Sequence, residues 1–215
     1  MRSLKTNAVV ILALMAAAVL LPAQEVVDRI VARMDTDIIL LSDVRLLAHY
    51  QLFVDGKSES DDVILDRLID QWIVKNEAKA SLFPQPSDDD VNRSLQRLKR
   101  SFSSPEEFEE RKKQSGMPDD EILRMLRLQL YLSNYLDSRF RASIQVDEKE
   151  IEEFYRTRVI PRAESRGQKP PALDAAKDFI QEVLVQRAIT AQSERWLKES
   201  RARIRIEKML SESQK

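Results

Sequence analysis

The residues that most often carry catalysis or bind metals are scarce in this chain. His49 is the only histidine, and the sequence contains no cysteine. This composition excludes a zinc site built on paired His or Cys ligands, and it excludes a Cys–His nucleophile. We expect His49 within the first helix, beside Leu46 and Leu47. An ordinary, partly buried helix position explains it more simply than a catalytic or pH-sensing role does.

An acidic run at residues 88–90, Asp-Asp-Asp, could be imagined as a cation site. It lacks the glycine and the distal glutamate of a calcium-binding loop. Because the run follows Ser87, it has instead the composition of a helix N-terminus, where carboxylates are favoured by the helix dipole. The sequence has no Gly-x-Ser-x-Gly turn and no glycine-rich phosphate loop. We therefore expect a protein that is not an enzyme, without catalytic residues, metal, cofactor or small-molecule substrate.

An excess of apolar side chains on the longest predicted helix, at residues 118–141, offers more to a binding function. They cover most of the helix circumference, which is typical of a central helix with neighbours on several sides. The residues on its shoulder are either core contacts with the last helix or the wall of a groove for apolar polypeptide segments. Tyrosine and methionine suit such a wall, because both adapt to varied partners. The candidates for this binding are Tyr50, Phe53, Met117, Met125, Leu128, Tyr131 and Tyr135.

Composition favours a helical protein. Of 215 residues, 43% are hydrophobic and 33% are charged, and only three are glycine, a mixture typical of long solvated helices around a packed core. Acidic and basic residues are interspersed and give a net charge of −1, so nucleic acid is not an expected partner. Without cysteine, the core has to supply the stability that disulfides give many exported proteins.

Residues 1–23 are predicted to be a secretory signal peptide. Arg2 and Lys5 precede an uninterrupted apolar run at residues 8–21, and the sequence Pro22-Ala23-Gln24 offers a cleavage region. The run is shorter than the roughly 20 residues that a membrane-spanning helix needs. An uncleaved N-terminal anchor is the alternative.

The pattern of elements predicts a mainly α fold with a small antiparallel sheet formed by the N- and C-terminal strands. A hairpin is expected at residues 26–41, with Ser42 as the N-cap of the helix that follows. The segment 161–172, with its glycine and prolines, is expected to be a loop. Alternation at residues 202–206 predicts a final strand that joins the hairpin. Helices are expected at about residues 42–54, 61–83, 88–102, 105–116, 118–141, 148–155 and 173–200.

Several segments, in their order along the chain, resemble the SurA-type periplasmic chaperones. Residues 27–44 resemble the opening strands and helix of that family, and residues 65–71 resemble its next helix. Residues 146–155 and 196–206 resemble the segments that flank its parvulin prolyl-isomerase domain. A parvulin domain needs about 100 residues. Only a short loop separates the two flanking helices here, so the resemblance is to a form without the isomerase.

The resemblance implies a SurA-like helical chaperone core at residues 24–159, a loop at 160–172 in place of the parvulin insertion, and a C-terminal helix and strand at 173–215 that complete the core. It also implies an ATP-independent periplasmic chaperone, a holdase, whose partners are unfolded outer-membrane or secreted polypeptides. Pairing of two chains into a homodimer stays open. The alternatives are a structural adaptor for one specific envelope partner and, less expected, a residual peptidyl-prolyl isomerase.

Overall fold

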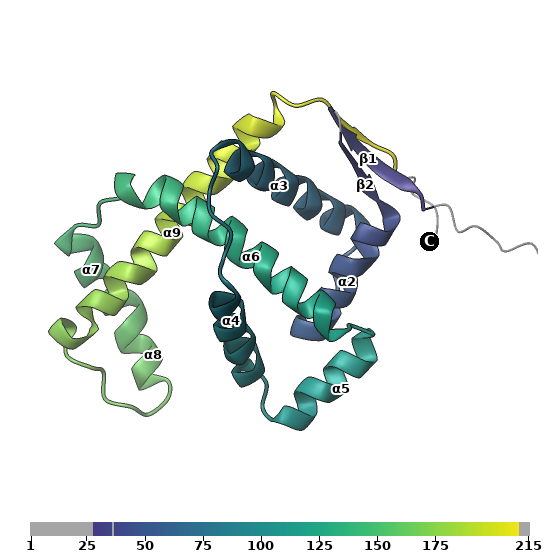
Figure 1. Cartoon of the computed structure of the whole chain (residues 1–215). Coiled ribbons are helices and arrows are strands. Elements are labelled where there is room, and N and C mark those ends of the chain that lie inside the picture. Colours follow the sequence, from purple (N-terminus) through teal and green to yellow (C-terminus); the bar gives the residue numbers. More distant parts are fainter. Residues whose placement is uncertain (1–27, 36, 211–215) are drawn as a thin grey trace, which may run out of the picture.

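The computed structural model describes residues 28–35 and 37–210, and it confirms a mainly α fold with a small antiparallel sheet (Figure 1). The predicted signal peptide at residues 1–23 lies outside the described residues. The strands are β1 (Ile30–Met34), β2 (Asp37–Leu40) and β3 (Ile206–Lys208). The longer helices are α2 (Leu41–Asp55), α3 (Asp61–Ala80), α4 (Asp88–Ser101), α5 (Pro105–Ser115), α6 (Asp119–Phe140) and α9 (Leu173–Arg201). Between α6 and α9 lie a 3-10 turn η1 (Arg141–Ser143), α7 (Glu148–Phe154), a π-helical turn η2 (Tyr155–Val159) and α8 (Ile160–Glu164).

The sheet has the strand order β2-β1-β3, with both pairs antiparallel, so the two ends of the described chain meet as predicted. Ala32 of β1 pairs with Ile39 on one side and with Lys208 on the other. The register shifts between Ile30 and Ala32, which lets both Val31 and Ala32 reach the core. Strict alternation of inward and outward residues did not anticipate this. The final strand also begins later than predicted, because residues 202–204 form a turn after α9.

Helix α6 occupies the centre of the bundle, as its broad apolar circumference predicts, and it crosses in front of α9 in Figure 1. It contacts α3, α4 and α9. An aromatic cluster joins α2, α4 and α5 at one end of the bundle. Phe53, Phe102 and Phe108 have ring centroids 5.2–5.5 Å apart, and Phe53 is fully buried. These contacts make one continuous core from the sheet to α5.

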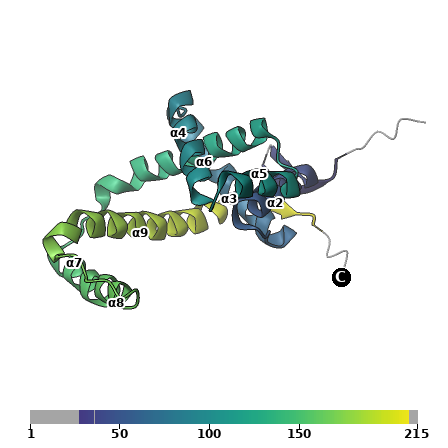
Figure 2. The ribbon, with the colours of Figure 1, turned by 90° about the horizontal axis from the view of Figure 1, so that it is seen from below.

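Helix α7 and the turn η2 pack on the first half of α9, and α8 continues from η2, so that these elements form a projecting arm (Figure 2). The arm has a small core of its own around Ile151, Ala176 and Ile180. The second half of α9 instead packs in the main core through Trp196 and Leu197. The expected division at residue 159 therefore needs correction: residues 146–159 belong to the arm, and α9 is shared by both cores.

The loop expected at residues 160–172 begins later than predicted, because the chain stays helical from Ile160 to Glu164. Proline normally ends or kinks a helix, since it has no N–H for the bond to residue i−4. Just before it, the Ile160 N–H donates to the Tyr155 carbonyl, five residues back, so the hydrogen-bond pattern has already changed. The remaining loop, 165–172, is closed by the Tyr155 hydroxyl, which donates to the Pro171 carbonyl at 2.6 Å.

The start of α2 also differs from its prediction, since Leu40 and not Ser42 occupies the N-cap position. The Asp43 carboxylate accepts a hydrogen bond from the Leu40 N–H at 2.8 Å, which satisfies an amide that the helix leaves unpaired. The Ser42 hydroxyl donates to Asp28 instead. Within the described ranges, no helix is long and apolar enough to cross a membrane.

Candidate functional site

Helices α2, α3 and α6 leave an open apolar groove between them, which we call the α2–α3–α6 groove. It consists of two adjoining hollows of about 230 Å³ and 380 Å³. The hollows share Leu46, Lys75, Met125 and Leu128, so they form one continuous depression. The other lining residues are Ile39, Asp43, Leu47, Leu68, Gln71 and Trp72 in the first hollow and Gln85, Glu121, Arg124, Arg127 and Tyr131 in the second.

Four large apolar side chains in this groove are only half-buried: Leu46, Leu68, Trp72 and Leu128. Leu68 and Trp72 are four residues apart on α3, so they lie on the same face of the helix. The Trp72 indole N–H donates to an Asp37 carboxylate oxygen at 2.7 Å. This bond fixes the orientation of the indole and satisfies its polar edge, while the rest of the ring remains an apolar wall.

Charged groups around the groove are of both signs, and all of them except Lys75, which forms no ion pair within the described residues, are engaged. Arg127 donates to Asp88 at 2.6 Å and to the Pro86 carbonyl at 3.1 Å, and Arg124 pairs with Glu121. Asp43 is engaged at the start of α2. The groove therefore combines an apolar floor with a balanced polar rim, an arrangement that suits apolar segments of varied sequence more than ligands of one charge.

The seven residues predicted to bind a client divide between core and groove. Four belong to the core away from the groove, where burial leaves little surface for a partner. These are Tyr50, Phe53, Met117 and Tyr135, with exposed fractions of 5% or less. Met125, Leu128 and Tyr131 do line the groove, although Met125 and Tyr131 are themselves buried. Only Leu128 offers a half-exposed apolar side chain.

Tyr50 illustrates why burial removes a candidate. Its hydroxyl donates to the Gln129 side-chain oxygen at 3.0 Å, so its polar tip is already satisfied within the protein. Burial raises the pKa of Tyr50 to about 12, against a smaller opposite effect of the Gln129 hydrogen bond. Tyr135 packs edge-on against Phe83 with ring centroids 5.5 Å apart. Both tyrosines act as core residues in this structure.

Leu46, Leu68 and Trp72 are the groove residues that sequence reasoning missed as binding candidates. The four-residue spacing of Leu68 and Trp72 is enough to place them on one apolar face of α3. Periodicity alone does not distinguish a face that is covered by another helix from a face that lines a groove. The separation of α2, α3 and α6 in space decides which of the two a face is.

The two sequence features that could have done chemistry have ordinary roles. His49 lies on α2 as expected, but it is exposed and not partly buried, and it does not line the groove. The acidic run begins α4 as predicted: the Ser87 hydroxyl accepts from the Asp90 N–H at 3.2 Å, and the Asp90 carboxylate accepts from the Ser87 N–H at 3.2 Å. The Ser87 hydroxyl also holds the pKa of Asp90 below its usual value. In the part of the chain that the structure describes, no group of three His, Cys, Asp or Glu residues is arranged to hold a metal ion.

The fold and groove define a class: a mainly α protein whose chain ends share a three-stranded sheet and whose bundle carries an open apolar groove. No family model matches the sequence, and no curated protein matches it. The relation to the SurA-type chaperones accordingly rests on the resemblance of the segments quoted above.

Proposed function

We propose that this protein is an ATP-independent chaperone of the cell envelope, a holdase that binds unfolded outer-membrane or secreted polypeptides after export to the periplasm. In this proposal the α2–α3–α6 groove receives apolar client segments and assists their folding by preventing aggregation. The protein acts by binding, not by catalysis, and needs no cofactor.

The observation that carries the proposal is the set of half-buried side chains around the groove: Leu46, Leu68, Trp72 and Leu128. Removing such surface from water contributes about 25 cal/mol per Å² of apolar area, without requiring a particular client sequence. An extended segment that places apolar side chains in the two hollows would cover both at once. The paired charges on the rim leave the client free to vary in charge.

Client release follows from the same physics. The sequence has no phosphate-binding loop that would couple release to nucleotide hydrolysis. Shallow apolar contacts made at several points dissociate readily, because the cost of ordering a flexible chain offsets much of the favourable burial. Once a client folds, it buries its own apolar segments, and these can no longer rebind to the groove.

The experiment that tests the proposal measures binding of the purified protein to a fluorescently labelled outer-membrane barrel polypeptide diluted from urea, with the natively folded barrel as control. We expect anisotropy to rise with the unfolded form only. Leu128→Gln should weaken this binding about fivefold, since roughly 1 kcal/mol of apolar contact is lost from a half-buried leucine.

A matched control is Leu136→Gln, which alters another half-buried leucine of α6 that does not line the groove. It should leave client binding unchanged. Equal binding by wild type and Leu128→Gln would remove the groove from the proposal, and no binding to unfolded polypeptide would overturn the holdase. Co-purification of one folded envelope protein in stoichiometric amount would favour the adaptor instead.

A further inference from the structure

The projecting arm carries a second hollow, of about 430 Å³, between η2–α8 and α9. We call it the arginine pocket. Figure 2 shows α8 beside the first half of α9, from which the two walls come. Its apolar residues are Phe154, Val159, Ala163, Phe179 and Val183, and its polar residues are Arg158, Arg162, Arg166, Gln168 and Arg187. Four arginine side chains thus line the pocket together with the apolar ones, and no acidic residue of the described ranges lines it.

Among residues 28–35 and 37–210, these four arginines have no carboxylate partner and form no ion pair. The whole chain has a net charge of −1, so four unpaired cations in one hollow are a local concentration of positive charge. The Arg187 guanidinium lies 4.8 Å from the centroid of the Phe154 ring. This cation–π contact orients the side chain without neutralising it.

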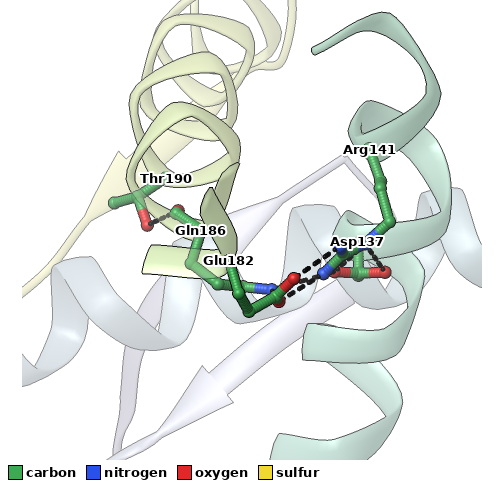
Figure 3. A network of polar contacts seen from close by, with 5 residues as sticks. All are labelled: Asp137, Arg141, Glu182, Gln186 and Thr190. Carbon is green, nitrogen blue, oxygen red and sulfur yellow. Dashed lines mark hydrogen bonds and ion pairs between the residues drawn. The ribbon is translucent and has the colours of Figure 1, made fainter. Parts of the chain in front are cut away.

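An adjoining hollow of about 310 Å³ extends the pocket along α9 and shares Phe179, Val183 and Arg187 with it. The carboxylate that lines this adjoining hollow is Glu182, and it is already engaged in hydrogen bonds within the protein. It accepts hydrogen bonds from Arg141 at 2.8 and 3.0 Å and from Gln186 at 2.9 Å, as Figure 3 shows. Glu182 therefore does not satisfy the arginines of the pocket.

Phe179 adds an apolar anchor point at the mouth. It is 69% exposed, which is unusual for an aromatic side chain, and it lines both hollows. A partner that covers Phe179 while it brings negative charge to the four arginines would satisfy both features. Arginine binds carboxylates in a paired, planar geometry, so carboxylate side chains are the matching groups.

The shape of the site favours a polypeptide over a lipid. An acyl tail gains affinity through full burial of its methylene groups, about 0.8 kcal/mol for each one. The apolar lining consists of five side chains in an open hollow, which does not cover a long tail. Gln168 lines the pocket, and Gln186 and Thr190 line the adjoining hollow. The side-chain donors of Gln186 and Thr190 are already engaged, but their side-chain oxygens can still accept from peptide N–H groups. We propose that the arginine pocket binds an acidic polypeptide segment in which carboxylate side chains flank an aromatic or branched apolar residue.

The test uses the purified protein and a fluorescein-labelled peptide of Gly, Glu and Phe in which every Phe has Glu on both sides. We expect saturable binding that weakens as salt is added. A peptide with Lys in place of Glu, and one with Ser in place of Phe, should bind much more weakly. The double variant Arg158→Gln/Arg162→Gln should lose about tenfold or more in affinity, and Phe179→Ala about threefold.

Matched controls remove the same charge and the same kind of exposed apolar group elsewhere. Arg100→Gln/Arg195→Gln changes two exposed arginines outside the pocket, and Leu82→Ala removes an 89% exposed leucine. Neither should change the affinity. Because all the replaced side chains are exposed, thermal melting should confirm that each variant is folded.

Three results would overturn the proposal. The first is equal peptide affinity of the arginine variant and its control. The second is displacement of the peptide by anionic phospholipid vesicles that bind the wild type but not the arginine variant, and the third is concentration-dependent self-association that the arginine variant abolishes. The second result would assign the pocket to a membrane surface and the third to another copy of the chain. The groove variant Leu128→Gln should bind the acidic peptide with the affinity of the wild type. Binding of unfolded client and binding of acidic peptide are thus measured independently, and one proposal can fail while the other stands.

Discussion

Arg141, directly after α6, forms a bidentate ion pair with Glu182 on α9. Its Nη1 and Nη2 donate to the two carboxylate oxygens of Glu182 at 3.0 and 2.8 Å. The Arg141 Nε also donates to Asp137 at 2.9 Å, and Gln186 donates to both carboxylates (Figure 3). This network lies where the chain passes from the main core to the arm. It therefore connects two bodies whose hydrophobic cores are separate.

Removing the ion pair should loosen the arm without unfolding the bundle. In Glu182→Gln the side chain keeps its size but loses the charge that Arg141 recognises. We expect roughly severalfold faster hydrogen exchange in α7 and α8, and unchanged exchange in α2 and α3, because local opening depends on local contacts. Glu194→Gln, an exposed change on the same helix, is the control. Equal exchange in both variants would show that the arm is held by its own core alone.

The same pair predicts a pH dependence. Hydrogen bonds from Arg141, and then from Gln186, lower the pKa of Glu182 from its ordinary value of 4.5 to about 2. Because the folded pKa is lower than the unfolded one, the pair's contribution is fully present above pH 4.5 and is lost as the pH falls through about 2. The difference in arm exchange between wild type and Glu182→Gln should be constant above pH 5 and should shrink between about pH 4.5 and 2. A difference that stays constant over that interval would contradict the assignment.

Phe53 should be among the most sensitive positions in the main core. It is fully buried and packs against Phe102 and Phe108. Phe53→Ala should lower the free energy of unfolding by about 3–5 kcal/mol, because it leaves a cavity among three elements. Urea unfolding followed by tryptophan fluorescence measures this. Phe179→Ala, at a 69% exposed position, should change stability by less than about 0.5 kcal/mol.

Local sequence signals predicted most of the fold because they act over a few residues. The α4 cap at Ser87, Pro105 in the first turn of α5 and Gly116 after its end all mark helix boundaries within short windows. The broad apolar circumference of residues 118–141 likewise identified α6 as the central helix. The error at Pro161 arose because a π-helical turn depends on where the neighbouring helix packs, which a window around the proline does not contain.

The candidate groove was harder to predict, because it depends on gaps between helices. Leu128 does line the groove, whereas Phe53 and Tyr50 pack in the core against partners far away in sequence, such as Phe108 and Gln129. An apolar position carries the same pattern whether a neighbouring helix covers it or stops short of it. Only the tertiary arrangement distinguishes these two cases.

Two glycines form a matched pair that separates backbone strain from steric conflict. Gly56 and Gly116 end α2 and α5 with left-handed φ values of 73° and 67°. Gly116→Ala should cost about 1 kcal/mol, since a Cβ there meets nothing but the left-handed backbone is unfavourable. At Gly56 a Cβ would lie 2.6 Å from Arg111 Nη1, so the guanidinium must also move. Gly56→Ala should therefore destabilise more than Gly116→Ala in urea unfolding, and equal losses would show that Arg111 moves freely.

Arg201, the last residue of α9, ties the end of the chain to α3. Its guanidinium donates to Asp70 Oδ1 at 2.6 Å, to Asp66 Oδ1 at 2.9 Å and to the Asp66 carbonyl at 2.6 Å. Lys208 of β3 reaches the same Asp66 oxygen at 2.7 Å, so one carboxylate joins helix α3 to both α9 and the sheet. Partial burial lowers the pKa of Arg201, but the hydrogen bonds to Asp70 and Asp66 outweigh this and raise it.

Arg201→Ala should lower the free energy of unfolding by about 2 kcal/mol, the usual loss for hydrogen bonds that involve charged groups. Arg201→Lys should recover little of it, because an ammonium group keeps the charge but does not reproduce the planar fork that reaches three oxygens. Arg195→Ala, an exposed arginine on the same helix, is the control and should cost less than about 0.5 kcal/mol. Full recovery by lysine would mean that charge alone holds α9 against α3, and the geometry of the fork would then be incidental.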